Sequence, residues 1–229
     1  MKNVLIPPSS LNFLKELKKN NNRDWFNKHK DRYLSEHQHI IAFADAFLAE
    51  MNKHDNIETP TGKKSLHRIY RDSRFSKDKT PYKVNWSGSF TRATKSLRGG
   101  YYFHIEPGNS FLGGGFWQPN PEDLKRIRQE IEFNAGELRK ILKSKNFINT
   151  FGTLQGEQVK NAPKGFSSDH PDIDLLKYKQ FLISHRFTDK EVLSPDFLKQ
   201  ANETFKKMRP FFDYMSHALT TDLNGVSLV

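Results

Sequence analysis

The segment from His67 to Lys83 has the residue types that could bind an anion. It reads HRIYRDSRFSKDKTPYK and brings arginines, lysines, tyrosines and two aspartates together within one short stretch. Guanidinium groups bind phosphate or carboxylate through paired hydrogen bonds, and a lysine adds a mobile point charge. The side chains that we expect to hold such an anion are Arg68, Arg71, Arg74, Lys79 and Lys83.

The same segment has a purely structural interpretation. Asp72 could neutralise Arg68 and Arg74 in an ion-pair network, and exposed pairs of this kind stabilise a fold only slightly. Asp78 and Pro81 would then shape the turn that follows. Asp72 is also a candidate for proton transfer, because it is one of only two acidic residues among these cations.

A second pattern lies in the sequence YYFHIE, which begins at Tyr101. In a β-strand, Tyr102, His104 and Glu106 would lie on one face. Histidine changes its charge near neutral pH, so Tyr102 and His104 are candidates for general acid–base chemistry. A strand whose polar face meets solvent would produce the same alternation, and both interpretations stay open.

Three further motifs were weighed for chemistry. Lys164 stands between Pro163 and Gly165, and a lysine in such a rigid turn could project into a cleft and join the arginines, or simply be exposed. The glycine run 113–115 does not open directly into a helix, so it predicts close packing against bare backbone rather than a phosphate loop. The acidic run 169–174 resembles a helix cap more than a metal site, and we predict no metal and no cofactor.

Elements that would position these residues can be predicted from hydrophobic periodicity and capping residues. The expected fold class is α+β, a single domain over residues 1–229, with an antiparallel meander of about four or five strands packed with N-terminal and C-terminal helices. The expected parts are a helical region 9–54, a sheet region 64–118, helices in 121–150, a loop at 152–174, a strand at 179–187 and a C-terminal helix at 195–218. Within the sheet region the expected strands are 65–75, 84–92, 100–106 and 110–118.

Charge is concentrated in the middle of the chain. The 229 residues carry a formal net charge of +11, with 37 Lys and Arg against 26 Asp and Glu. Eleven of those basic residues and only two acidic ones lie between residues 61 and 100, which gives this stretch +9. A focused excess of this kind creates a local potential that attracts phosphate, carboxylate or a polyanion.

Composition excludes several classes of protein. The chain has no cysteine, which excludes disulfide scaffolds, thiolate metal sites and cysteine nucleophiles. Its longest apolar stretch, around residues 40–48, is too short to span a bilayer, so no membrane association is expected. The first residues have no signal-peptide core, and a cytoplasmic protein is the expectation.

Several separated motifs resemble a known family. They are the string 68–83, NNRDWF at 21–26, the Tyr101-Tyr102 pair, GGGFWQP at 113–119 and PKGF at 163–166. Together they resemble the uncharacterised family catalogued as domain of unknown function 2461, over roughly residues 11–212. The resemblance implies a single conserved domain, and it brings no activity, substrate or catalytic residue.

Two functions from different classes follow from the sequence, and whether the protein is an enzyme is left open. The favoured hypothesis is a pocket for a small anionic or phosphorylated ligand. The alternative is a nucleic-acid-binding module in which the basic segment, with Arg92, Lys95 and Arg98, follows phosphates. In that case Tyr82, Trp86 or Phe90 would stack on bases. A protein-interaction domain that meets an acidic partner is the third possibility, and the oligomeric state is not predicted.

Overall fold

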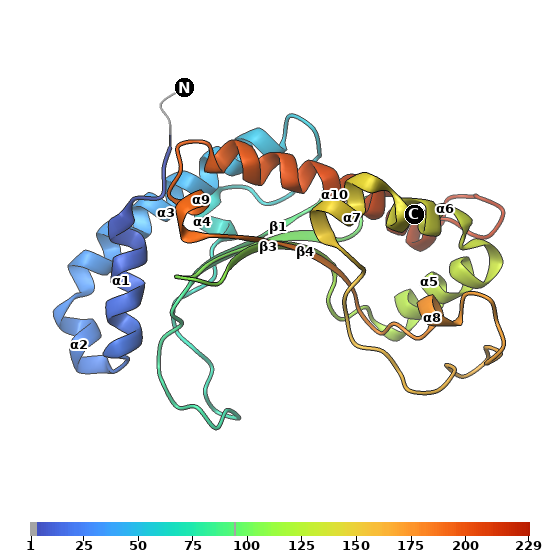
Figure 1. Cartoon of the computed structure of the whole chain (residues 1–229), viewed down its shortest axis with the longest axis horizontal. Helices are drawn as coiled ribbons and strands as arrows, with labels where there is room; N and C mark the ends of the chain where they lie inside the picture. The colour runs from blue at the N-terminus through green and yellow to red at the C-terminus, as the bar shows by residue number, and fades with distance from the viewer. Residues whose placement is uncertain (1–3, 94) are drawn as a thin grey trace. The chain divides into compact units, whose positions relative to one another are not determined.

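The computed structural model describes residues 4–93 and 95–229 (Figure 1). Its four named strands form one antiparallel sheet in the order β1 (Trp86–Thr91), β2 (Gly100–Ile105), β3 (Ser110–Phe116) and β4 (Phe181–Phe187). The predicted α+β fold class is confirmed. The hairpin between β2 and β3 turns at Pro107 and Gly108, and Gly108 has a φ of 73°, a conformation that glycine adopts without a steric penalty.

The longer helices occupy the regions that periodicity predicts, whereas three four-residue helices of the described residues lie outside those regions. The N-terminal region contains α1 (Pro8–Lys19), α2 (Arg23–Lys28), α3 (Lys30–Met51) and α4 (Gly62–Ser65). After β3 come α5 (Pro121–Asn134), α6 (Gly136–Lys143) and α7 (Lys145–Phe151), and the later helices are α8 (Ile173–Leu176), α9 (Asp189–Val192) and α10 (Phe197–Thr220). Asn120 caps α5, because its side chain accepts a hydrogen bond from the backbone N–H of Asp123.

The chain divides into two compact units. The first unit comprises residues 1–90, 102–112 and 186–203, and the second comprises residues 91–101, 113–185 and 204–229.

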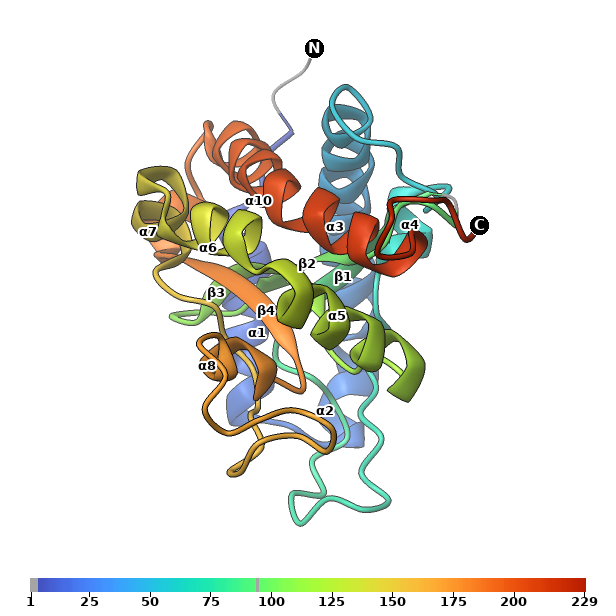
Figure 2. The ribbon, with the colours of Figure 1, turned by 90° about the vertical axis from the view of Figure 1, so that its right-hand side faces the viewer.

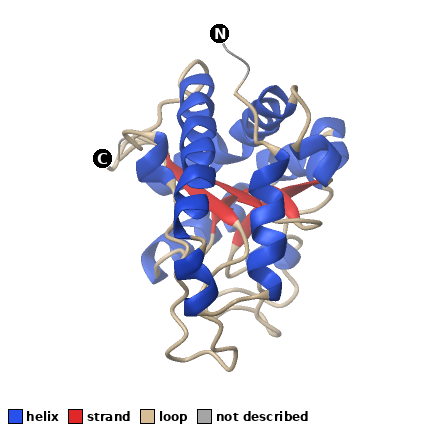
Figure 3. Ribbon diagram, turned by 90° about the vertical axis from the view of Figure 1, so that its left-hand side faces the viewer, coloured by secondary structure: helices blue, strands red, loops and turns tan. Residues whose placement is uncertain are grey.

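Aromatic rings form the core of the first unit. Phe43 and Phe47 on α3 contact Phe103 on β2, and Phe47 also meets Phe90 on β1 edge to face. All four rings are at most 1% exposed. Figure 3 colours the helices blue and the strands red. Because each ring buries a large area, this layer compensates for the small number of aliphatic residues.

In the second unit, helix α10 packs against the glycine run of β3. A side chain at Gly114 would collide with the ring of Phe212 and the sulfur of Met208. Gly115 has a φ of 129°, and a Cβ there would lie 2.1 Å from the carbonyl oxygen of Phe181. The predicted close packing against bare backbone is therefore confirmed. Figure 2 shows this unit's helices α5–α7 and α10.

One predicted strand is absent. Residues 65–75 were expected to form a regular strand, but their pairing is limited to two isolated antiparallel bridges, Leu66 with Gly88 and Tyr70 with Tyr82. The remainder of the segment is irregular because its backbone groups bond locally to Asp72, Asp78 and Lys79 side chains. A regular strand over 65–75 would place Arg68, Tyr70, Asp72 and Arg74 on one face, and this irregular segment does not have that alternation.

Candidate functional site

Residues 67–85 form an irregular two-stranded loop between α4 and β1, here called the arm. It extends away from the sheet and helices of its own unit (Figures 1 and 2). Two backbone hydrogen bonds join its two sides, from Arg71 N–H to the carbonyl of Pro81 and from Lys83 N–H to the carbonyl of Ile69. The arm thus has a hairpin-like base.

The corner between α1 and α2 holds that base in place. The amide of Asn21 donates to the carbonyl of Tyr82 at 2.9 Å and accepts from the Tyr82 N–H at 3.1 Å. Phe26 stacks on the Tyr82 ring with centroids 4.0 Å apart. Asn22 caps α2, which fixes the position of Phe26. The NNRDWF motif therefore supports the arm.

Ion pairs organise the tip of the arm. Arg71 donates to the carboxylate of Asp78 and to the hydroxyl of Thr80. Arg74 bonds Asp72 through its Nε and Nη2 atoms, at 3.0 and 2.7 Å. These bonds lower the pKa of Asp72, and they lower that of Asp78 to about 2. The structural interpretation is confirmed for the Asp72–Arg74 pair.

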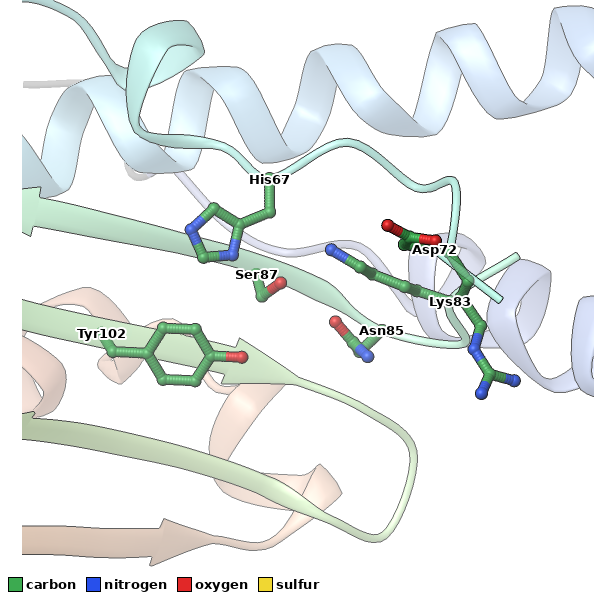
Figure 4. A pocket seen from close by; sticks show the side chains of 7 residues that line it. His67, Asp72, Lys83, Asn85, Ser87 and Tyr102 are labelled. Atoms are coloured by element: carbon green, nitrogen blue, oxygen red, sulfur yellow. The ribbon is translucent and has the colours of Figure 1, made fainter. Parts of the chain in front are cut away.

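An open pocket of about 320 Å³ lies where the arm meets β1 and β2. Its lining residues are His67, Arg71, Asp72 and Lys83 from the arm, with Asn85, Ser87 and Tyr102. Figure 4 shows Lys83 extending toward His67 and Ser87, and the Tyr102 hydroxyl pointing toward the same space from β2. All of these residues belong to the first unit.

Among the positively charged side chains that line the pocket, Lys83 is the one whose charge is least compensated by a carboxylate. Burial lowers its pKa, and the neighbouring Arg68 lowers it further. Among the described residues, no carboxylate lies within ion-pair distance of its ammonium group. Burial and Lys83 likewise lower the pKa of His67, which keeps that ring neutral near pH 7.

A hydrogen-bonded chain of three side chains leads away from the pocket along β2. The Tyr102 hydroxyl lies 3.0 Å from His104 Nδ1, and His104 Nε2 lies 3.0 Å from Glu106 Oε2. The Ser87 hydroxyl is also hydrogen-bonded to Tyr102. The side chains of His104 and Glu106 are only 12% and 16% exposed. The predicted sharing of one strand face is confirmed, and that face is not a solvent-exposed one.

Asn85 leaves an unused hydrogen-bonding atom in the pocket wall. Its Oδ1 atom is buried and has no hydrogen-bond partner in the described part of the chain. A buried polar atom without a partner costs about 1–3 kcal/mol. Rotation of the amide would instead turn its NH₂ group toward the same position, so a ligand or water that bonds this amide would remove the cost.

The other predicted site residues lie outside the pocket lining. Arg68 is exposed and acts on Lys83 and Asp72 only through its charge. Lys79 donates to the backbone carbonyls of Ser73 and Arg74 and so closes the tip. Arg74 is paired with Asp72, and Lys164 is an exposed turn residue of the second unit.

The residues assigned to nucleic-acid contact are mostly buried, which is a correction. Tyr82 and Trp86 are 4% exposed and Phe90 is fully buried, so these rings cannot stack on bases. The Arg92 side chain is also fully buried and pairs with Asp213, while Arg98 pairs with Asp123. Sequence reasoning placed them on the surface because strand alternation does not reveal which face a second layer covers.

Four residues of the site were missed as site residues. His67, Asn85 and Ser87 line the pocket, and Glu106 ends the hydrogen-bonded chain. Ser87 alternates with buried Trp86 at the start of a predicted strand, which was the one available signal. His67 and Asn85 reach the pocket through irregular backbone, which no periodicity describes.

A larger groove, of about 570 Å³, lies in the second unit and is a weaker candidate. Glu137, Lys140 and Lys207 are its charged residues, and Phe147 and Pro210 contribute apolar surface.

In the described ranges, no cluster of acidic, histidine or cysteine side chains could hold a metal ion. The acidic run 169–174 is occupied otherwise, since Arg139 bonds Asp172 and Asp174. Within the described residues, no helix is long and apolar enough to cross a membrane.

Comparison with known proteins identifies a family and nothing more specific. No curated protein and no solved structure matches the chain. The profile of the family described as "Conserved hypothetical protein (DUF2461)" matches residues 9–214, which include the arm, the pocket and the Tyr102 chain. Because that match covers most of the sequence, the chain belongs to this conserved hypothetical family.

Proposed function

We propose that the pocket at the base of the arm binds a small anionic ligand, with a phosphate-type group as the best fit. The observation that carries the proposal is the Lys83 ammonium, which faces a pocket and has an arginine rather than a carboxylate as its charged neighbour. An anion placed there relieves this repulsion. The Asn85 amide is a neutral donor beside the same space, which the Ser87 and Tyr102 hydroxyls also line.

The local charge balance favours a ligand with one concentrated negative group. Arg71 also lines the pocket, but it forms an ion pair with Asp78, and Asp72 forms an ion pair with Arg74. Lys83 therefore contributes most of the unshared charge. A volume of about 320 Å³ accommodates a small molecule and lies at the lower end of ordinary ligand pockets.

Calorimetric titration with inorganic phosphate and with phenyl phosphate tests this proposal. Lys83→Gln should weaken binding at least about tenfold, equivalent to about 1.4 kcal/mol. The matched control is Lys77→Gln, which removes the same charge from the exposed tip outside the pocket lining. Equal affinity in the wild type and Lys83→Gln, or no binding by the wild type, would overturn the proposal.

A second candidate, binding of single-stranded nucleic acid, is favoured by one specific observation. Phe75 at the tip of the arm is 97% exposed, and the Arg74 guanidinium lies 5.9 Å from its ring centroid. Lys77 and Lys79 beside it are exposed as well. An exposed ring among cations is the arrangement that stacks on bases while the charges follow the phosphates. This ring replaces the buried rings that the sequence suggested.

Fluorescence anisotropy with a labelled oligothymidine, measured across a salt series, tests this candidate. Phe75→Ala should weaken binding about 5- to 100-fold, because stacking contributes roughly 1–3 kcal/mol per base. Phe133→Ala removes another exposed ring, on α5, and should leave the affinity unchanged. If the wild type does not bind at low salt, or if both variants bind equally, the arm is not a nucleic-acid-binding element.

A further inference from the structure

The hydrogen-bonded side chains of Tyr102, His104 and Glu106 stand in an order that can pass a proton from one to the next. A phenol in the pocket contacts an imidazole, and the imidazole contacts a carboxylate on its other side. Tyr102 and His104 lie two positions apart on β2, and Glu106 follows directly after the last residue of that strand. Successive side chains on one strand face stand side by side, and these three lean together closely enough to bond.

Neighbouring elements hold these three side chains in place. Phe111 on β3 stacks on the His104 ring, with centroids 4.8 Å apart. Asn109 donates to Glu106 Oε2 at 3.0 Å, and the Ser110 hydroxyl accepts from the Glu106 N–H and donates to the Glu106 carbonyl. The ammonium of Lys18 on α1 approaches the other Glu106 oxygen to 4.0 Å. The carboxylate is therefore oriented before any ligand arrives.

Charge determines which tautomer of His104 this arrangement favours. Burial would raise the pKa of Glu106, but hydrogen bonds from His104 and Asn109 outweigh it and the pKa is lowered. An ionised carboxylate only accepts hydrogen bonds, so His104 Nε2 must carry a proton. In the neutral ring Nδ1 is then bare and accepts the proton of the Tyr102 hydroxyl. Burial raises the pKa of Tyr102, which keeps its hydroxyl protonated at neutral pH.

We propose that Tyr102, His104 and Glu106 form a proton relay whose outer end opens into the anion pocket. The inference rests on the proposed anion binding and adds a class of ligand to it: a small anion with an ionisable hydroxyl group. In the step proposed, the ligand hydroxyl gives its proton to the Tyr102 oxygen while the Tyr102 proton moves to His104 Nδ1. The products are a ligand alkoxide and an imidazolium.

The surroundings stabilise both charges that this step creates. Glu106 stabilises the imidazolium, as a carboxylate does in hydrolase triads. Lys83, which lines the same pocket as Tyr102, is the cation available to stabilise the alkoxide. His67 and Arg71 also face this space, and Asp72 faces it while paired with Arg74. The Ser87 side chain partly offsets the rise that burial causes in the pKa of Tyr102.

Reaction with an aryl sulfonyl fluoride, mapped by mass spectrometry, tests the relay without a known substrate. Attack by the Tyr102 oxygen forms an O–S bond and expels fluoride, while the phenol proton passes to His104. Tyr70 is an internal reference, because it is a more exposed phenol of the same unit. We expect Tyr102 to react at least tenfold faster than Tyr70.

The diagnostic variant is Glu106→Gln, which keeps a hydrogen-bond acceptor for His104 but removes the negative charge. It should slow the labelling of Tyr102 about 10- to 100-fold and leave the labelling of Tyr70 and the binding of phosphate unchanged. A wild-type Tyr102 that reacts no faster than Tyr70, or an unchanged rate in a folded Glu106→Gln variant, would overturn the relay.

Nitrogen-15 NMR of His104 in the wild type provides a second test that needs no variant. The relay requires a neutral ring protonated at Nε2, and a ring protonated at Nδ1 alone would exclude it. The tests also separate the two proposals. Phosphate binding without selective Tyr102 reactivity retains the pocket and rejects the relay, whereas selective reactivity without phosphate binding rejects the anion pocket.

Discussion

At the residue scale, the partner of each cation decides what that cation can do. Arg71 and Lys83 both line the pocket, yet Arg71 bonds Asp78 and Thr80, while Lys83 has Arg68 as its charged neighbour. An anion must compete with a carboxylate for Arg71, whereas at Lys83 it relieves a repulsion. The residue types alone would have favoured arginine, because it binds phosphate through two parallel bonds.

The lowered pKa of Lys83 predicts how anion binding depends on pH. An anion binds the ammonium form, so binding weakens as pH rises through the Lys83 pKa, and that pKa lies below the ordinary value of 10.5. Sulfate is the suitable probe, since its own charge is constant over this range. Its affinity, measured by titration from pH 7 to pH 10, should decline with a midpoint below 10.5.

Lys83→Arg is the control for this pH dependence. A guanidinium stays protonated throughout, so the variant should bind sulfate equally at pH 7 and pH 10. A decline of the same size in the wild type and in Lys83→Arg would show that another group titrates, with circular dichroism confirming that both remain folded.

At the element scale, periodicity predicts the regular parts of this chain well. The strands predicted at 84–92, 100–106, 110–118 and 179–187 correspond to β1–β4, and the helical regions are present. Hydrophobic alternation and capping residues are local signals, and these elements form from residues that are close in the sequence. Tyr102, His104 and Glu106 lie together because period two places them together.

Periodicity does not predict the path of the arm, for a physical reason. Its path is set partly by local side-chain bonds to backbone within the arm. It is also set by contacts between distant residues, namely the bonds of Asn21 to Tyr82 and the burial of Ile69 and Tyr82. The residues that the structure brings together at the pocket are Arg71, Asp72, Lys83 and Tyr102 from the prediction. His67 and Asn85 also line the pocket, and they reach it through the irregular backbone of the arm.

The support of the arm by Asn21 gives a prediction for this element. Asn21→Ala removes both bonds to the Tyr82 backbone and leaves a buried N–H and C=O unpaired, so it should destabilise the fold by about 1–3 kcal/mol. Urea unfolding measures the loss, and hydrogen exchange should quicken at Tyr82. Asn20→Ala removes only an exposed bond to Glu16 and should change stability by less than about 0.5 kcal/mol. Equal losses in the two variants would contradict this role of Asn21.

At the scale of the whole molecule, the concentrated positive charge separates into two kinds. In the second unit, Arg92 and Arg98 form ion pairs with Asp213 and Asp123, and they serve the fold. In the first unit, the arm holds its cations near a pocket and an exposed ring. The net charge of +9 over residues 61–100 therefore overstates the charge that is available to a ligand.

This separation predicts that neutralising a structural partner lowers global stability. The Arg92 side chain is fully buried and bonds Asp213 Oδ1 at 2.6 Å, the Ser216 hydroxyl and the Arg98 carbonyl. Asp213→Asn removes the negative charge to which that buried guanidinium is bonded. Complete loss of a buried pair costs about 3–5 kcal/mol, but Asp213 itself is half exposed, so we expect about 1–3 kcal/mol in urea unfolding.

Glu203→Gln is the matched control, because it neutralises an exposed carboxylate on the same helix, α10. It should change the free energy of unfolding by less than about 0.5 kcal/mol. Anion binding at Lys83 should be the same in both variants, since Asp213 and Glu203 are outside the pocket lining. If Asp213→Asn unfolds at the same urea concentration as the wild type, the buried arginine does not depend on this carboxylate.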